Sequence, residues 1–313
     1  MSKVLITGGA GFIGSNLADT LITSGDEVII IDNLYSGRIS YVNPKAKFYL
    51  ADIRDDIIDN VFNVEKPDIV IHLAAQMSVP FSVEDPKFDL DVNLKGLLNL
   101  LDASVKNKVE KFIFSSSGGT VYGDVQYPVS EEAPLKPFPP YAITKTTSEH
   151  YLDFYRKQYG LEYVVLRFAN VYGPRQVSAH ESGVVTIFTE KFLKKEPAVI
   201  YTFPNQKGGM RRDYIYVSDV VSGIEASMKY KKTDVFNLGT GIATETLEII
   251  KTLSDIQGYS IEHSFGPPRD GDLEETYLII DKAKELLNWE PKVMLKDGLS
   301  RTVDYFKTIM DMK

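Results

Sequence analysis

The sequence of 313 residues contains no cysteine, and histidine is scarce. Without cysteine, disulfide bonds, thiolate nucleophiles and cysteine-ligated zinc are excluded, and nothing indicates an oxidising compartment. The histidines lack the spacing of metal ligands, so we expect no metal site. They are His72, His150, His180 and His263.

Positive charge is also in short supply, with 35 lysine and arginine residues against 43 aspartate and glutamate residues. A nucleic-acid-binding surface needs a basic footprint, so this balance argues against one, although local arginines can still hold an anionic ligand. No apolar run approaches the roughly 20 residues that span a bilayer. A strand-like run already begins at Lys3, where a signal segment would lie. We therefore expect a cytoplasmic protein.

Glycine, by contrast, is concentrated near the N-terminus. Gly8, Gly11 and Gly14 follow the apolar run Lys3–Ile6 and lead into a segment with helical apolar spacing. Such glycines permit a tight turn and a close approach of backbone to pyrophosphate, which the helix N-terminus attracts. The next apolar run, Glu27–Ile31, ends at Asp32, an acid suited to the adenosine ribose hydroxyls. The unit predicts a dinucleotide site and favours NAD over NADP.

Apolar strand-like runs alternate with helical segments through the first half of the chain. This alternation indicates a doubly wound parallel sheet, a Rossmann-type α/β fold, whose ligands lie at the carboxyl ends of the strands. Residues that follow predicted strands should therefore meet in one crevice: Asp52, Ala74, Ala75, Ser115, Ser116, Ser117 and Asn170.

The pattern changes after Pro174 to shorter helices and strands. We expect a NAD-binding domain at residues 1–169 and a smaller C-terminal α/β domain for the substrate at residues 170–313. The runs near 212–217 and 235–238 are candidates for strands that rejoin the first sheet.

Tyr141 and Lys145 lie four residues apart on one predicted helix, so the phenol and the ammonium share a face. A tyrosine pKa is ordinarily about 10, and one unit charge at ~4 Å contributes roughly 4 kcal/mol at an effective dielectric constant near 20. We expect Lys145 and a cationic nicotinamide ring to lower the pKa of Tyr141 toward working pH, as a general base requires. The serines that end the preceding strand should supply a hydroxyl opposite, with Ser117 preferred and Ser116 as the alternative.

These motifs together resemble an extended short-chain dehydrogenase/reductase. The segments that carry this resemblance are Thr7–Gly14, Asp32–Asn33, Leu73–Ala75, Asn93, Ser115–Ser117, Tyr141 and Lys145. Other segments resemble the UDP-glucose 4-epimerase group of nucleotide-sugar 4-epimerases: Ser115–Gly123, Arg167–Arg175, Arg211–Val217, Arg269–Asp272 and Leu287–Pro291.

The resemblance implies a tightly held NAD and no net redox change. Tyr141 would take the proton of the sugar 4-hydroxyl while hydride leaves C4, and the 4-keto sugar would turn before hydride returns to its opposite face. The implied cofactor contacts are Gly8, Gly11, Phe12, Ile13, Gly14, Asp32, Asn33, Asp52, Ile53, Leu73, Ala74, Ala75, Asn93, Ser115, Tyr141, Lys145 and Phe168. The implied contacts to a UDP-sugar are Ser117, Tyr141, Asn170, Arg212, Arg269 and Thr276. A homodimer through the helices near Asp89–Lys106 and Tyr141–Tyr159 is implied as well.

Three positions depart from the pattern of this group. The serine loop differs in length from that of many relatives, which leaves Ser116 and Ser117 open as the catalytic hydroxyl. Gly183–Val185 replaces an asparagine that reaches the nucleotide in many relatives. Thr276 stands where some relatives carry a bulky tyrosine, so we expect the pocket to accept UDP-N-acetylglucosamine (UDP-GlcNAc) as well.

Two other functions remain open from the sequence. The first is a nucleotide-sugar dehydratase or decarboxylase on the same scaffold. Such a dehydratase needs an extra acid in the serine loop, and Ser115–Gly123 contains none. The second is a non-catalytic, NAD-sensing regulator, which the intact Tyr141 and Lys145 argue against.

Overall fold

A parallel sheet forms the centre of the computed structural model, which describes residues 1–178, 183–269 and 272–311. Within these residues the sheet has seven strands in the order β11-β6-β5-β4-β1-β2-β3, and every neighbouring pair is parallel. The strands are β1 (Lys3–Thr7), β2 (Glu27–Asp32), β3 (Lys47–Leu50), β4 (Ile69–His72), β5 (Lys111–Ser117), β6 (Tyr163–Phe168) and β11 (Asp234–Leu238). The prediction of a Rossmann-type fold is confirmed.

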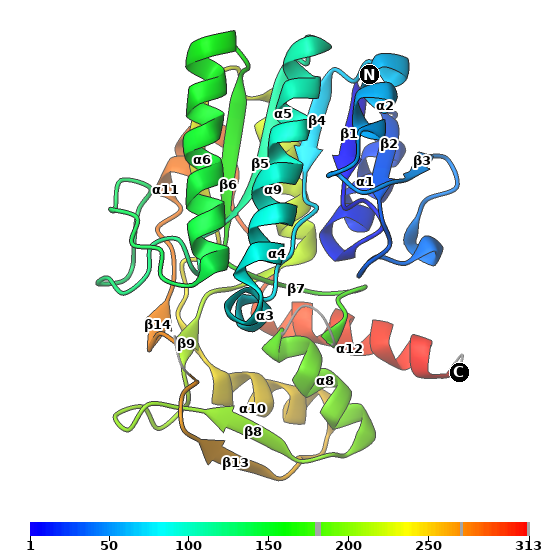
Figure 1. The fold of residues 1–313 in the computed structure, drawn as a ribbon. Coiled ribbons are helices and arrows are strands. Elements are labelled where there is room, and N and C mark those ends of the chain that lie inside the picture. Colours follow the sequence, from blue (N-terminus) through cyan, green and yellow to red (C-terminus); the bar gives the residue numbers. More distant parts are fainter. Residues whose placement is uncertain (179–182, 270–271, 312–313) are drawn as a thin grey trace.

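Helices cover both faces of this sheet, as Figure 1 shows with α5 and α6 in front and α9 behind. They are α1 (Phe12–Thr23), α2 (Ile57–Glu65), α5 (Gly96–Lys106), α6 (Pro140–Tyr159) and α9 (Val217–Lys229). Side chains alternate along each strand, so β1 serves both layers. Val4 and Ile6 pack in the cluster that includes Leu17 of α1, whereas Leu5 packs in the cluster that includes Leu97 of α5.

Short helical turns connect β4 to α5. They are α3 (Val79–Glu84), α4 (Pro86–Leu90) and the π-helical turn Asp91–Lys95, while a 3₁₀ turn, Ile39–Tyr41, follows β2. The sequence predicts one helix from Asn93 to Lys106, but a π turn occupies its start and α5 begins at Gly96. Both α3 and α4 pack against α6, so this connection helps to position Tyr141.

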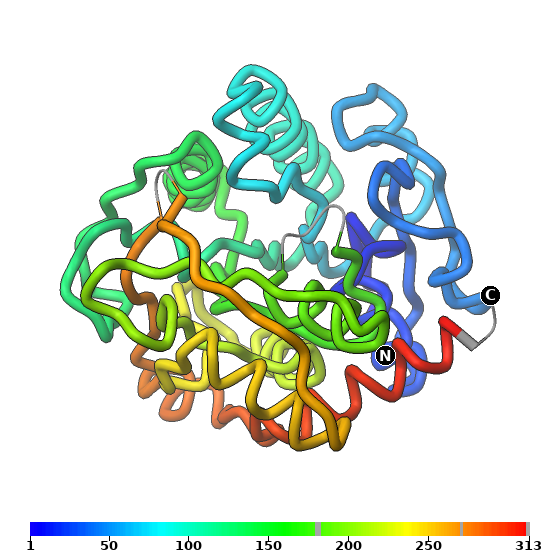
Figure 2. Tube along the Cα trace, turned by 90° about the horizontal axis from the view of Figure 1, so that it is seen from below, coloured from blue at the N-terminus to red at the C-terminus, as the bar shows by residue number. Residues whose placement is uncertain are grey.

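The C-terminal elements form a second, smaller α/β group below the carboxyl ends of the sheet (Figures 1 and 2). Its strands pair as β7 (Asn170–Tyr172) with β10 (Tyr214–Tyr216), as β12 (Thr244–Glu245) with β9 (Arg211–Arg212) and β14 (Glu275–Thr276), and as β8 (Ala198–Tyr201) with β13 (His263–Gly266). Its helices are α8 (Val184–Lys194), α10 (Thr246–Gln257) and α12 (Leu295–Asp311), whereas α11 (Asp281–Leu287) packs against β11 and α9 of the main sheet.

The two late runs that were candidates for the main sheet behave differently. The run near 235–238 forms β11, which pairs with β6 at the sheet edge. The run near 212–217 does not join the sheet, because Tyr214–Tyr216 pairs with β7 in a separate ladder. No helix in the described ranges is long and apolar enough to cross a membrane.

Candidate active site

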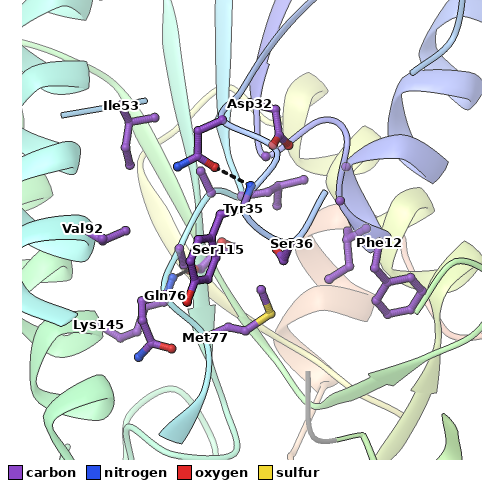
Figure 3. A pocket seen from close by; sticks show the side chains of 18 of the residues that line it. Phe12, Asp32, Tyr35, Ser36, Ile53, Gln76, Met77, Val92, Ser115 and Lys145 are labelled. Atoms are coloured by element: carbon purple, nitrogen blue, oxygen red, sulfur yellow. Dashed lines mark hydrogen bonds between the residues drawn. The ribbon is translucent and has the colours of Figure 1, made fainter. Parts of the chain in front are cut away.

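A cavity of about 390 Å³ follows the carboxyl ends of the central strands. In Figure 3 Asp32 and Ile53 lie toward one end of this cavity, and Lys145 and Met77 lie toward the other. Its lining includes nearly all of the predicted cofactor contacts: Gly8, Gly11, Phe12, Ile13, Gly14, Asp32, Asn33, Asp52, Ile53, Leu73, Ala74, Ala75, Ser115, Tyr141, Lys145 and Phe168.

The loop between β1 and α1 leaves no room for a side chain at Gly8 or Gly14. Gly8 has φ +72°, and a Cβ there would lie 2.7 Å from the backbone nitrogen of Ala74. A Cβ on Gly14 would lie 2.2 Å from the carbonyl oxygen of Gly8. These residues therefore form a bare backbone surface at a helix N-terminus, which suits a pyrophosphate.

Asp32 ties this loop to the end of β2. Its carboxylate accepts hydrogen bonds from the backbone N–H groups of Ala10 at 2.9 Å and Leu34 at 2.8 Å. Burial raises the pKa of Asp32 above its ordinary value, and these two hydrogen bonds act against that rise. The side chain lines the cavity, where ribose hydroxyls can donate to it.

An ion-pair cluster lies at the same end of the cavity. Arg54 bonds both carboxylate oxygens of Asp52 at 2.8 and 2.9 Å, and it also reaches Asp91 at 2.7 Å. The guanidinium lies 5.4 Å from the ring centroid of Phe88. The hydrogen bonds from Arg54 lower the pKa of Asp52 to about 2, so this carboxylate is charged at neutral pH.

Tyr141 and Lys145 of α6 lie at the other end, as predicted from their spacing. The Lys145 ammonium donates to the carbonyl oxygen of Ser115 at 2.7 Å and lies 5.8 Å from the centroid of the Tyr141 ring. Ser117 lines the same cavity, and its hydroxyl acts to lower the pKa of Tyr141. Phenol, ammonium and hydroxyl thus meet at the end of β5.

Burial is the largest effect on the pKa of Tyr141 and on that of Lys145. In the described residues, burial and the charge of Asp89 raise the pKa of Tyr141 above its ordinary value, and the hydrogen bond from Ser117 lowers it. Burial lowers the pKa of Lys145 to about 8, against the opposing effects of Asp89 and Glu149. Desolvation of the phenolate is the largest effect on Tyr141 here, and the lowering expected from Lys145 together with a nicotinamide ring stays a prediction.

The three serines at the end of β5 have different partners. Ser115 donates to the carbonyl oxygen of His72 at 2.9 Å, and Ser116 donates to Glu149 at 2.6 Å. Ser117 is the serine that reaches Tyr141. Ser116 and Ser117 both line the cavity but have different partners.

Glu149 belongs to a buried ion pair behind these serines. Arg167 of β6 donates to its two carboxylate oxygens at 3.1 and 2.6 Å, and also to the hydroxyl of Tyr122 at 2.9 Å. The hydroxyl of Tyr122 donates in turn to Asn237 of β11 at 2.7 Å. This network links α6 to the strands that end at the site.

The predicted substrate contacts other than Ser117 and Tyr141 are not among the residues that line this cavity. Arg212 and Thr276 are neighbours in the β9–β14 ladder, and Arg212 donates to the carbonyl oxygen of Leu273 at 2.8 Å. Arg269 lies 4.4 Å from the ring centroid of Tyr201. Asn170 donates to the carbonyl oxygen of Asp213 at 3.1 Å.

Among the cofactor predictions, Asn93 is placed differently from the others. It lies outside the described lining and instead bonds the backbone of Gln76, accepting at 2.9 Å and donating at 3.0 Å. Gln76 and its neighbour Met77 line the cavity and were missed, although both follow the predicted contact Ala75 after β4.

Further lining residues were missed for similar reasons, and a few predictions lie outside the described ranges. Tyr35, Arg54, Phe88 and Gln176 line the cavity from loops and a short helix that no strand pattern identifies. His180 and the motif residues Asp270 and Gly271 lie outside the described residues. No group of three or more histidine, cysteine or acidic residues within the described ranges is arranged to hold a metal ion.

Comparisons with known proteins agree with this geometry. The profile of the NAD dependent epimerase/dehydratase family matches residues 4–239. The chain belongs to this family. It is 40% identical over 312 residues to a UDP-glucose 4-epimerase of Mycolicibacterium smegmatis, covering 97% of this chain and 98% of the relative.

Two solved structures are closely similar to this chain over nearly its whole length. One is the UDP-glucose 4-epimerase of Thermotoga maritima with UDP-glucose, with a TM-score of 0.95, 46% identity and coverage of 98% of this chain and 99% of that chain. The other is the UDP-glucose 4-epimerase of Thermus thermophilus in complex with NAD, with a TM-score of 0.93, 42% identity and coverage of 97% and 98%.

Proposed function

We propose that the protein is an NAD-dependent UDP-sugar 4-epimerase that interconverts UDP-glucose and UDP-galactose. The observation that carries this proposal is the meeting of Tyr141, Lys145 and Ser117 at one end of a cavity with a glycine loop and Asp32 farther along it. The similarity to UDP-glucose 4-epimerases over nearly the full length supports it.

The residues of the cavity fit NAD. The bare backbone at Gly8 and Gly14 suits the pyrophosphate, Asp32 suits the adenosine ribose, and Asp52 with Ile53 suits the adenine. Once bound there, NAD supplies the hydride acceptor and donor of the reaction. Asn93 would act one step removed, by fixing the backbone of Gln76.

The side chains at the other end move and hold protons. Ser117 accepts the proton of the sugar 4-hydroxyl while its own hydroxyl proton passes to the phenolate of Tyr141. The positive charges of Lys145 and of the bound nicotinamide favour that phenolate and oppose the effect of burial. Ser116 is committed to Glu149, so we propose Ser117 as the catalytic serine. The same phenol returns the proton when the 4-keto sugar is reduced on its opposite face.

The UDP group would lie on the C-terminal side of the cavity. Arg212 and Arg269 carry the forked guanidinium groups that bind phosphate in pairs of hydrogen bonds, and Asn170 supplies an amide. Residues 1–169 would form the NAD-binding domain, with β11 added to its sheet, and residues 170–313 would supply most of the UDP-sugar site.

We also propose that the sugar pocket accepts UDP-GlcNAc. Thr276 is a small residue beside Arg212, and its hydroxyl has no hydrogen-bond partner among the described residues. The variant Thr276→Tyr should lower kcat/KM for UDP-GlcNAc much more than for UDP-glucose. Equal rates with UDP-GlcNAc in both proteins would contradict this role.

A homodimer fits the surface of α6. Ile143, Tyr151 and Phe154 are exposed on one face of this helix, while Leu97 and Leu101 of α5 are fully buried in the core. The apolar face that remains for a second copy is therefore mainly that of α6.

The decisive experiment incubates the purified protein with UDP-galactose and no added NAD, followed by separation of the nucleotide sugars. We expect UDP-glucose as the product and no net formation of NADH. Loss of water or carbon dioxide from UDP-glucose or UDP-glucuronate would instead favour a dehydratase or decarboxylase. Tyr141→Phe should lower the turnover number by a factor of about 10² to 10⁴, and the variant should still bind NAD. A non-catalytic regulator that only senses NAD would lose little of its function in this variant.

A further inference from the structure

A buried carboxylate without a cationic hydrogen-bond partner lies behind the Tyr141–Lys145 pair. Asp89 of α4 has 0% exposure, and its hydrogen-bond partners in the described part of the chain are neutral. One carboxylate oxygen accepts from Gln76 at 2.8 Å and from Asn93 at 3.0 Å, and the other accepts from Thr144 at 2.8 Å. A buried charge is costly unless it is fully hydrogen-bonded, and these three donors meet that requirement.

The three donors place Asp89 at the junction of the elements that form the site. Thr144 precedes Lys145 on α6, and its hydroxyl also lies 3.0 Å from the carbonyl oxygen of Tyr141. Gln76 lines the cavity. Asp89 therefore connects the loop after β4 to the first turn of the helix that carries the phenol and the ammonium.

The charge of Asp89 acts on both reacting groups. It raises the pKa of Tyr141 and opposes the loss of the proton from Lys145. Lys145 is the charged group that acts on Asp89, and Glu149 is the second carboxylate that acts on Lys145, among the described residues.

We propose that Asp89 is a positioning residue of the proton-transfer site, whose buried negative charge keeps Lys145 protonated and strengthens the basicity of Tyr141. The proposal rests on the proposed function, because it assigns the base of that reaction. It differs from a purely structural role, in which Asp89 only fastens Thr144, Gln76 and Asn93.

Asp89→Asn separates these two roles. The amide oxygen can still accept from Gln76 and Asn93, and the amide nitrogen can donate to Thr144, whose hydroxyl is then free to donate to the carbonyl oxygen of Tyr141. The variant keeps the shape and removes the charge. Thr144→Val does the reverse, since it breaks the Asp89–Thr144 bond and keeps the charge. Asp102→Asn is the matched control, because Asp102 also bonds α6, through Tyr155, at a distance from the cavity.

The readout is the titration of Tyr141 in the NAD complex, followed by NMR of ring-labelled tyrosine and assigned with Tyr141→Phe. We expect the midpoint in Asp89→Asn to fall by about one unit, and the midpoints in Thr144→Val and Asp102→Asn to match the wild type. The same midpoint in Asp89→Asn as in the wild type, or an equal shift in Thr144→Val, would overturn the proposal. Asp89→Ser serves as a second neutral variant, so that the comparison does not depend on one protein folding.

The pH profile of epimerisation gives a second readout. Both limbs of the profile should move to lower pH in Asp89→Asn, so that activity relative to the wild type falls as the pH rises. A uniform loss at all pH values would assign Asp89 a structural role only. Absence of epimerisation in the wild type would refute the proposed function, while the NMR titration would still decide the electrostatic role of Asp89.

Discussion

At the scale of single residues, the role of each serine hydroxyl in the site depends on its hydrogen-bond partner. Ser116 and Ser117 are chemically identical neighbours, yet Ser116 is buried and bonds Glu149, whereas Ser117 is partly exposed and acts on Tyr141. The sequence predicts a serine here but not which one, because the choice depends on the strand-to-helix contact with Glu149.

Separate alanine variants of the two serines should therefore differ in kind. Ser117→Ala should lower kcat by about 10² while the unfolding midpoint stays close to the wild type, because a group at the reacting oxygen is lost. Ser116→Ala should lower the free energy of unfolding by about 1 kcal/mol, the typical loss for one hydrogen bond. Steady-state kinetics and urea unfolding measure the two effects, and the reverse pattern would assign the catalytic role to Ser116.

Lys145 should give the cofactor-free protein a distinct pH dependence of stability. Its pKa is lowered from 10.5 to about 8 in the folded chain, so the unfolded chain binds this proton more tightly. Burial of the protonated ammonium lowers the free energy of unfolding by its full amount below pH 8. This loss shrinks as the pH rises toward 10.5, so the stability contributed at this position increases with pH. Between pH 7.5 and 9.5 the wild type should gain about 2 kcal/mol relative to Lys145→Met in urea unfolding. A constant difference over that range would contradict the lowered pKa.

At the scale of elements, α6 is attached to the sheet by the buried pair of Glu149 and Arg167. Arg167→Met should lower the free energy of unfolding by about 3–5 kcal/mol, because it leaves a buried carboxylate without its cation. Asp153→Asn breaks an exposed ion pair with Lys157 on the same helix. This variant should change the free energy of unfolding by less than about 1 kcal/mol. Urea unfolding of both variants tests the contrast. Similar losses in the two would mean that burial does not govern these pairs.

The elements themselves were largely predictable, because the spacing of apolar residues and the length of each run identify β1, β2 and α6 directly. Tyr141, Lys145 and Glu149 follow one another at four-residue intervals, so even the third member of that row could have been noticed. Asp89 could not, because its role arises from α4 packing on α6, a contact between segments more than fifty residues apart. The pairing of Tyr214–Tyr216 was beyond the sequence pattern for the same reason: a strand run does not reveal which sheet it joins.

At the scale of the whole molecule, the proposed homodimer predicts a single-site disruption. Phe154 is 49% exposed in the C-terminal half of α6, where a second copy would cover it. Phe154→Glu should convert a dimer into a monomer, because a charge buried in an apolar interface has no partner. Analytical ultracentrifugation of both proteins at micromolar concentration measures this change. A monomeric wild type would rule out the interface.

The position of β11 has a consequence for how the chain is made. This strand and the helix before it, α9, are added to the first sheet only after the chain has passed through β7, β8, β9 and β10. On the ribosome, the nascent N-terminal half must therefore wait with the edge of β6 unpaired and the face beneath α9 uncovered. An open edge of this kind invites pairing with other chains. Residues 1–169 expressed alone should consequently aggregate, and a chaperone that shields the edge during synthesis would raise the yield of the intact protein.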